Sequence, residues 1–175
     1  SAKPAPNEDE APEAAVEPAG DYLEIVANHE PKKPSDPATM RITGIKVVEA
    51  DFDPKKLEGA TATFELDFNT LSSAKPDRDD HLKSDDFLDV AQFPTASVVV
   101  TNVKAVDAGY TANAKVTAKG VSADWLLTFE ALDITDSSVR IKGSHKFGRS
   151  IFKIGSPGNQ ADELEAKWDI TLKQG

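Results

Sequence analysis

The chain has 175 residues, no cysteine, and a formal net charge of −10 at pH 7 that comes from 30 acidic and 20 basic side chains. This length suits one domain with a sizeable core, and the acidic balance argues against nucleic acids and anionic membrane surfaces as partners, since both attract basic proteins. Without cysteine the chain forms no disulfide and no cysteine-ligated metal site, and its longest aliphatic run, residues 98–100, is far shorter than the roughly 20 residues of a membrane-spanning helix.

Residues 1–21 are predicted to form a disordered tether. Ten of the first 20 residues are Ala or Pro and five are acidic. Such a segment buries too little apolar surface to offset the entropy lost on ordering. Tethers of this composition often follow the cleavage site of exported proteins, so we expect a removed signal peptide, with or without a lipid-anchoring cysteine, before Ser1. A cloning boundary at Ser1 is the alternative.

From residue 41 onward, apolar and polar side chains alternate with a period of two, which is the pattern of half-buried strands. Five apolar rows, together with residues 41–49 and 95–106, predict seven or eight strands. The rows are Ala62, Phe64, Leu66 and Phe68; Tyr110, Ala112, Ala114, Val116 and Ala118; Trp125, Leu127 and Phe129; Val139, Ile141 and Gly143; and Leu164, Ala166, Trp168, Ile170 and Leu172. Polar residues alternate with every row, which favours an antiparallel sheet, and eight such strands favour closure into a barrel. The predicted fold is therefore all-β, an extended antiparallel eight-stranded barrel over residues 22–175.

Several residues in the predicted inward rows are small, and a barrel of eight strands is wide enough to hold one small ligand. Small side chains along an apolar inner face leave volume, which is costly unless something occupies it. We therefore expect a lumen that holds a ligand. The alternative is a solid barrel in which five large neighbours fill the space, namely Phe64, Phe68, Trp125, Phe129 and Trp168.

Residues 75–94 break the strand pattern. Ser84 can cap a short helix that has Asp85 and Asp86 in its first turn, where negative charge suits the helix dipole. An apolar stripe follows the same segment, which closes at Pro94; the stripe consists of Leu82, Phe87, Leu88 and Val90. The pattern predicts a short helical cap loop at one mouth of the barrel.

Within this segment the chain reads Arg78-Asp79-Asp80-His81-Leu82-Lys83-Ser84-Asp85-Asp86-Phe87-Leu88-Asp89-Val90 and then Phe93-Pro94. This run resembles the Arg-Asp-x-His-Leu-Arg-Ser-x-Asp-Phe-Phe-Asp-Val segment and the Tyr/Phe-Pro pair of the YceI-like family. The earlier Asp53-Pro54-Lys55-Lys56-Leu57 is similar to the acidic-Pro turn of that family. The resemblance extends from about residue 42 to the C-terminus. One departure is Lys119-Gly120-Val121-Ser122-Ala123, where the family often has a His-Gly-Val/Thr-Thr-Lys turn.

The resemblance implies a lipocalin-like barrel that holds a long isoprenoid or similar lipid tail in its lumen, export to the periplasm or surface of a bacterium, and no catalysis. The residues expected to contact the ligand in the lumen are Phe64, Leu66, Phe68, Leu82, Phe87, Phe93, Tyr110, Ala114, Trp125, Phe129 and Trp168. Arg78 and His81 are expected either to orient the lipid head group or to fasten the cap by pairing with Asp79, Asp85 or Asp89. A different class of function, a surface interaction protein with a solid barrel on a flexible tether, is the alternative. The sequence leaves homodimerisation open for both.

The spacing of polar residues does not favour a metal site or a catalytic site. Four of the aspartates in the cap loop are candidate calcium ligands, but they lack the Gly and the distal Glu of an EF-hand loop; they are Asp77, Asp79, Asp80 and Asp85. His29, His81 and His145 follow no zinc-binding spacing. No nucleophile elbow and no phosphate-binding Gly-rich loop appears. The basic stretch at residues 142–153 is interpreted as a strand edge guarded by Lys, or alternatively as a docking patch for an anionic group. We expect neither a metal nor a cofactor, and no enzymatic activity.

Overall fold

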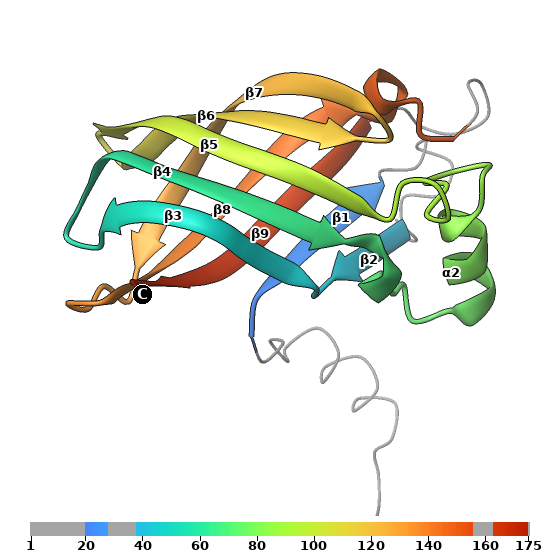
Figure 1. Cartoon of the computed structure of the whole chain (residues 1–175), viewed down its shortest axis with the longest axis horizontal. Helices are drawn as coiled ribbons and strands as arrows, with labels where there is room; N and C mark the ends of the chain where they lie inside the picture. Colours follow the sequence, from blue (N-terminus) through green and yellow to red (C-terminus); the bar gives the residue numbers. More distant parts are fainter. Residues whose placement is uncertain (1–19, 28–37, 156–162, 175) are drawn as a thin grey trace, which may run out of the picture.

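The computed structural model describes residues 20–27, 38–155 and 163–174. These residues form one nine-stranded antiparallel sheet with the strand order β2-β1-β9-β8-β7-β6-β5-β4-β3, curled on itself into a barrel-like shape (Figure 1). The predicted all-β antiparallel architecture is confirmed, with nine strands in place of eight. Residues 1–19 of the predicted tether and His29 lie outside the described residues, so the tether boundary stays a prediction.

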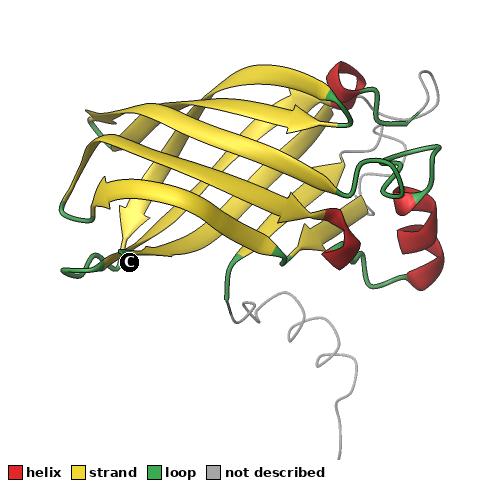
Figure 2. Ribbon diagram, viewed as in Figure 1, coloured by secondary structure: helices red, strands yellow, loops and turns green. Residues whose placement is uncertain are grey.

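The strands are β1 (Tyr22–Ala27), β2 (Ala38–Ile42), β3 (Ile45–Asp53), β4 (Lys56–Asp67), β5 (Thr95–Val106), β6 (Gly109–Ala118), β7 (Val121–Leu132), β8 (Ser138–Gly148) and β9 (Glu163–Lys173). Three short helices accompany them: η1 (Phe68–Thr70), α2 (Pro76–Lys83) and η2 (Arg149–Phe152). The helices gather at one end of the barrel, which we call the cap end, while the opposite end carries only turns and the end of β9 (Figure 2).

The two edge strands of the sheet, β2 and β3, are consecutive in the chain, so the chain itself joins the two edges of the curled sheet. The connection turns at Gly44, whose carbonyl accepts a 2.8 Å bond from the Asp67 amide and whose own amide donates to Thr70 Oγ1 at 2.9 Å. A Cβ at position 44 would lie 2.7 Å from the Cγ2 atom of Thr70. The close approach of the two segments therefore requires glycine.

The inner wall of the barrel is built from the predicted apolar rows. Ala112, Ala114, Val116 and Ala118 on β6 are buried, and the polar residues between them point to solvent or are half-buried. The same alternation continues on β9, from Leu164 to Leu172. Two clusters of buried residues follow from it, one at the cap end around Leu66, Phe68, Leu88 and Phe152, and one at the opposite end around Phe52, Leu57, Val103 and Leu172.

The helix predicted to begin at Ser84 is wrong, because α2 ends there. The Ser84 amide donates to the His81 carbonyl at 3.1 Å and closes the helix. Pro76 suits the first turn, where its missing N–H is not needed, and negative charge in that turn favours the helix dipole. The residues after Ser84 form tight turns, closed by a 2.8 Å bond from the Asp89 amide to the Ser84 carbonyl. Of the apolar stripe, Phe87, Leu88 and Val90 are buried in these turns, whereas Leu82 is half-buried on α2.

The interpretation of residues 142–153 as a strand edge is wrong for residues 142–144, which lie inside the sheet between β7 and β9. Residues 145–148 of β8 pair with β9 alone. Arg149, at the start of η2, is only 3% exposed, and its Nη1 donates to the carbonyl of Ile154 at 2.6 Å. This arginine is therefore part of the packed cap end and does not contribute to a basic surface.

Candidate functional site

The barrel encloses a cavity of about 190 Å³. All nine strands contribute to its wall, together with Phe68, Leu88, Phe152 and Ile154 from the loops and helices of the cap end. Among the described residues that line it, none is charged, and Thr61 is the only one with a hydroxyl group. The lining therefore offers an apolar ligand dispersion contacts and offers a polar ligand almost no hydrogen bonds.

Seven of the residues predicted to contact a ligand do line this cavity: Phe64, Leu66, Phe68, Ala114, Trp125, Phe129 and Trp168. Ala62, Ala118 and Ala166 also line it, as the argument from small inward residues requires. Gly143 differs from them. A Cβ there would lie 2.6 Å from Cζ2 of Trp168, so the indole ring of Trp168 fills the space that this glycine leaves.

Four other apolar residues predicted as ligand contacts lie away from the cavity wall. Phe87 is a buried member of the cap-end cluster, Leu82 packs against that cluster, and Phe93 lies against Gly120. Tyr110 stacks on Phe129, with ring centroids 5.5 Å apart and an angle of 18° between the rings. Contact of these four with a ligand stays a prediction.

Arg78 and His81 also lie outside the cavity wall. Nε of Arg78 donates to Oγ of Ser73 at 3.1 Å, and the carboxylate of Asp79 accepts bonds from the amide of Ser73 at 2.7 Å and from its hydroxyl at 2.6 Å. This small network ties the first turn of α2 to the segment that follows η1. His81 is exposed, and its ring centroid is 6.3 Å from that of Phe87. Arg78 thus helps to fasten the cap, through Ser73 in place of the expected pairing with an aspartate.

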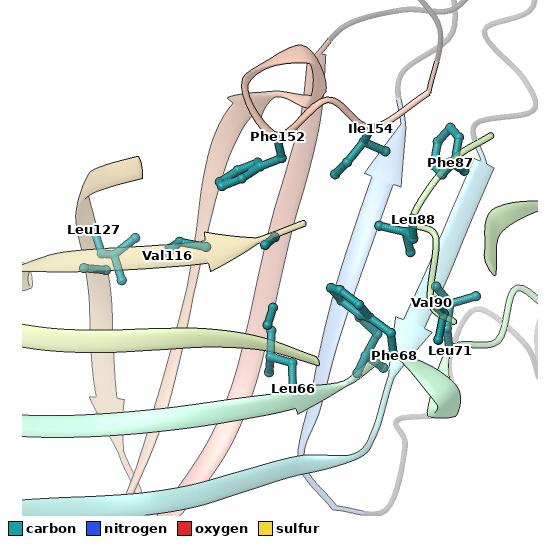
Figure 3. Packing of buried hydrophobic residues seen from close by; sticks show 14 residues of the cluster. Leu66, Phe68, Leu71, Phe87, Leu88, Val90, Val116, Leu127, Phe152 and Ile154 are labelled. Carbon is teal, nitrogen blue, oxygen red and sulfur yellow. The ribbon is translucent and has the colours of Figure 1, made fainter. Parts of the chain in front are cut away.

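The cap end of the cavity is closed by side chains. Figure 3 shows Leu88, Ile154 and Phe152 lying across this end, with Leu66 and Phe68 on the side of β4. Lys119, in the turn between β6 and β7, holds the closure together. Its Nζ donates to the carbonyls of Phe87 and Lys153, both at 2.8 Å, and so links three loops.

The opposite end is closed in a different way. Phe52, Leu57, Val103 and Leu172 line the cavity there. Gln174, directly after β9, donates from Nε2 to the carbonyl of Phe52 at 2.8 Å, which joins the end of β9 to β3. The cavity therefore runs along the barrel axis between the cap end and the opposite end.

The part of the cavity wall that β1 and β2 supply was not predicted from the sequence. Leu23 and Ile25 from β1 and Met40 and Ile42 from β2 all line the cavity. These strands have six and five residues, too short for a clear alternation. Val98 and Val100 on β5 were missed because the run of three valines hides which of them point inward.

Three ionisable groups of the wall have perturbed pKa values, and one of them is Arg140, whose pKa is raised by its hydrogen bonds to Asp169. On the outer face, a bidentate pair joins β8 to β9: Nε and Nη2 of Arg140 donate to the two carboxylate oxygens of Asp169 at 2.7 and 2.6 Å. These hydrogen bonds hold the pKa of the Asp169 carboxyl below its usual range. On β8, burial lowers the pKa of His145, whose ring stacks on Trp125 with centroids 4.5 Å apart.

Among the described residues, no group of three or more His, Asp or Glu side chains is arranged to hold a metal ion. None of the described helices is long and apolar enough to cross a bilayer.

Comparison with known proteins matches the YceI-like domain over residues 21–173. A UPF0312 protein of Shewanella denitrificans is 40% identical over 52 residues, which are 30% of this chain and 27% of that protein. A second UPF0312 protein, from Yersinia enterocolitica, is 34% identical over 71 residues, or 41% of this chain and 37% of that protein. The matched stretches thus span well under half of either relative.

Solved structures show the same fold at low sequence identity. BcnA of Burkholderia cenocepacia superposes with a TM-score of 0.77 at 18% identity, covering 87% of this chain and 96% of its own. The YCEI protein of Campylobacter jejuni gives 0.71 at 20% identity, covering 79% and 85%. A polyisoprenoid binding domain of Saccharophagus degradans implicated in plant cell wall breakdown gives 0.65 at 11% identity, covering 89% and 94%. With a domain match that spans nearly all of its barrel and a fold shared with these structures, the chain belongs to the YceI-like family.

Proposed function

We propose that the protein is an exported binding protein without catalytic activity, which holds an isoprenoid or another long apolar chain in the barrel cavity for carriage or storage. The observation that carries this proposal is the cavity itself, an apolar space of about 190 Å³ whose described lining has no charged residue. The similar Saccharophagus degradans structure, described as a polyisoprenoid binding domain, supports the same ligand class.

The energetics favour an occupied cavity. At roughly 24 cal/mol per Å³, an empty volume of 190 Å³ costs the fold about 5 kcal/mol. An apolar chain that fills it removes this cost and gains roughly 0.8 kcal/mol for each buried methylene. Strong polar contacts are therefore not needed for binding, and the length and shape of the tail decide which ligands fit.

Several parts of the proposal go beyond the cavity. Export rests on the Ala-, Pro- and Glu-rich composition of residues 1–21 and on the family resemblance. A binding role in place of catalysis is supported by the lining, because an apolar wall with one hydroxyl group supplies no acid or base. A lipid anchor and a homodimer are also proposals that do not follow from the cavity.

The alternative function, a solid barrel that acts as a surface interaction module, differs from the carrier proposal in whether the barrel has room for a ligand. A solid barrel has no room for a ligand, and the cavity volume therefore supports the carrier proposal over it. Titration with N-phenyl-1-naphthylamine, a dye that brightens in apolar surroundings, distinguishes the two. The carrier proposal expects saturable brightening with one dye per chain that geranylgeraniol reverses, whereas the absence of saturable binding would reject it.

A further inference from the structure

In the wall of the barrel, the backbone pairing between β7 and β8 stops part of the way along the two strands. The two strands pair only from Thr128–Ser144 to Leu132–Arg140, although β7 begins at Val121 and β8 continues to Gly148. Over the remaining residues each strand stays paired with its other neighbour, β7 with β6 and β8 with β9. In Figure 1 the two strands lie together near the C-terminus and separate towards η2. We call this opening in the hydrogen-bonded ladder the fork.

Aromatic rings fill the fork. The ring centroid of Trp125 on β7 is 4.5 Å from that of His145 and 4.9 Å from that of Phe147, both on β8, and 6.1 Å from that of Phe152 in η2. Trp125, Phe147 and Phe152 line the cavity on one side. Side-chain packing, which can rearrange without breaking backbone hydrogen bonds, therefore seals the cavity at the fork.

His145 is unusual among the residues of the inner wall. It follows Ile141 and Gly143 in the inward row of β8 and pairs with Ala166, which lines the cavity. Apart from Tyr110 it is the only ionisable side chain in the inward rows of the described strands, and within the described residues no hydrogen bond or ion pair satisfies its imidazole. A half-buried polar group without a partner is costly, and a ligand that supplied a hydrogen bond would remove that cost.

The size of the cavity indicates what such a ligand would place at the fork. At the roughly 30 Å³ that one molecule of liquid water occupies, 190 Å³ accommodates about six groups of the size of a methylene. A longer chain must extend beyond the chamber, and its polar end must reach a hydrogen-bonding partner. Hydrogen bonds hold both ends of the barrel together, from Lys119 to its linked loops at one end and from Gln174 to β3 at the other.

We propose that the fork is a side port of the cavity, in which the polar end of the bound chain lies between β7 and β8, Trp125 is the movable gate, and His145 donates or accepts a hydrogen bond to that end. The ligand class is a single-chain amphiphile with a small polar head, oriented with its head at the fork and its tail towards Phe52 and Leu172. This inference rests on the proposed function, because it assumes that the cavity holds an apolar chain.

Position-specific quenching tests the orientation. The chain has two tryptophans, so Trp168→Phe leaves Trp125 as the only one. A second reporter carries Trp125→Phe, Trp168→Phe and Phe52→Trp, which places the only indole at the opposite end of the cavity. Each protein is titrated with stearic acid that bears a nitroxide doxyl group at carbon 5, near the head, or at carbon 16, near the tail end, because a nitroxide quenches a nearby indole.

The proposal expects the label at carbon 5 to quench Trp125 more strongly than the label at carbon 16, and the reverse order for Trp at position 52. Equal quenching by both labels, or the reverse order at Trp125, would overturn the side port while leaving the carrier function standing. Saturable quenching of neither reporter by either label would instead reject the proposed function itself.

A variant tests the role of His145 as a positioning residue. His145→Phe keeps a ring that can stack on Trp125 and removes the hydrogen-bonding nitrogens. Loss of one hydrogen bond should weaken binding of stearic acid by about threefold to tenfold and reduce the preference of Trp125 for the carbon-5 label. The matched control is Ser144→Phe, which places the same ring on the adjacent, exposed position of β8 and should leave both readouts unchanged. Unaltered affinity and quenching order in His145→Phe would overturn the assignment of this residue.

Discussion

Ala114→Trp is the substitution that tests the cavity most severely. Ala114 lies at the middle of β6, is 1% exposed, and faces the cavity between its cross-strand neighbours Val100 and Trp125. An indole ring in its place projects into the chamber from the wall. The substitution therefore occupies the space that we assign to the ligand without touching either end of the barrel.

The expected loss of affinity follows from the volume. Six methylene-sized groups in 190 Å³, at roughly 0.8 kcal/mol each, give about 5 kcal/mol of tail burial, close to the estimated cost of leaving the cavity empty. Since about 1.4 kcal/mol corresponds to a tenfold change in affinity, an indole that fills most of the chamber should weaken binding at least about a hundredfold. Overpacking costs about 1–3 kcal/mol, and the gain from filling the void offsets part of it, so the fold should persist.

The assay is displacement of N-phenyl-1-naphthylamine by geranylgeraniol, with urea unfolding measured on the same samples. The matched control is Asn113→Trp, which places the same indole on the adjacent, exposed position of β6, where it points away from the cavity. Its affinity should equal that of the parent protein. A folded Ala114→Trp protein that binds the dye as tightly as the control would refute the assignment of the cavity as the binding site.

Three further predictions concern the closure and the wall of the barrel. Lys119→Ala removes two hydrogen bonds that link the cap loops, so it should lower the free energy of unfolding by about 1–2 kcal/mol and speed hydrogen exchange in the cap loop, whereas the exposed control Lys115→Ala should change neither. Burial lowers the pKa of His145 from 6.5, so as the pH falls the unfolded chain binds a proton before the folded chain does. The stability contributed by the neutral imidazole is therefore present above pH 6.5 and is lost as the pH falls through the folded pKa. Urea titrations at several pH values should show a flatter pH dependence of the unfolding free energy in His145→Phe. Gly143→Ala places a methyl group 2.6 Å from the ring of Trp168, so it should destabilise the protein by about 1–3 kcal/mol, and an unchanged melting temperature would contradict this packing.

The inner wall of the barrel could be predicted from the sequence because it depends on local alternation. Side chains in a strand point to opposite faces with a period of two, so a row such as Leu164 to Leu172 specifies its own inward face whichever strand it pairs with. Seven predicted contact residues reach the cavity for this reason. The prediction was incomplete at β1 and β2, which are too short to show a period, and the strand count fell one short.

The packing of the cap loops and the fork between β7 and β8 could not be predicted from alternation. Ser84 has the chemistry of a helix start, but Pro76 and the charges around it place the helix about two turns earlier, and the sequence alone does not rank these signals. Lys119 acts through carbonyls of two loops that are distant in sequence. The fork is invisible to alternation, because β7 and β8 keep their inward rows after their pairing stops.

The central claim is that the barrel carries a long apolar chain in its cavity. The most direct test is native mass spectrometry of protein purified from its own host, followed by extraction into organic solvent and titration of the stripped protein with geranylgeraniol. The account predicts a noncovalent adduct that the solvent removes and that one equivalent of the added isoprenoid alcohol restores, with Ala114→Trp unable to take it up. A protein that carries no adduct from its host and remains unliganded throughout the titration would contradict the account.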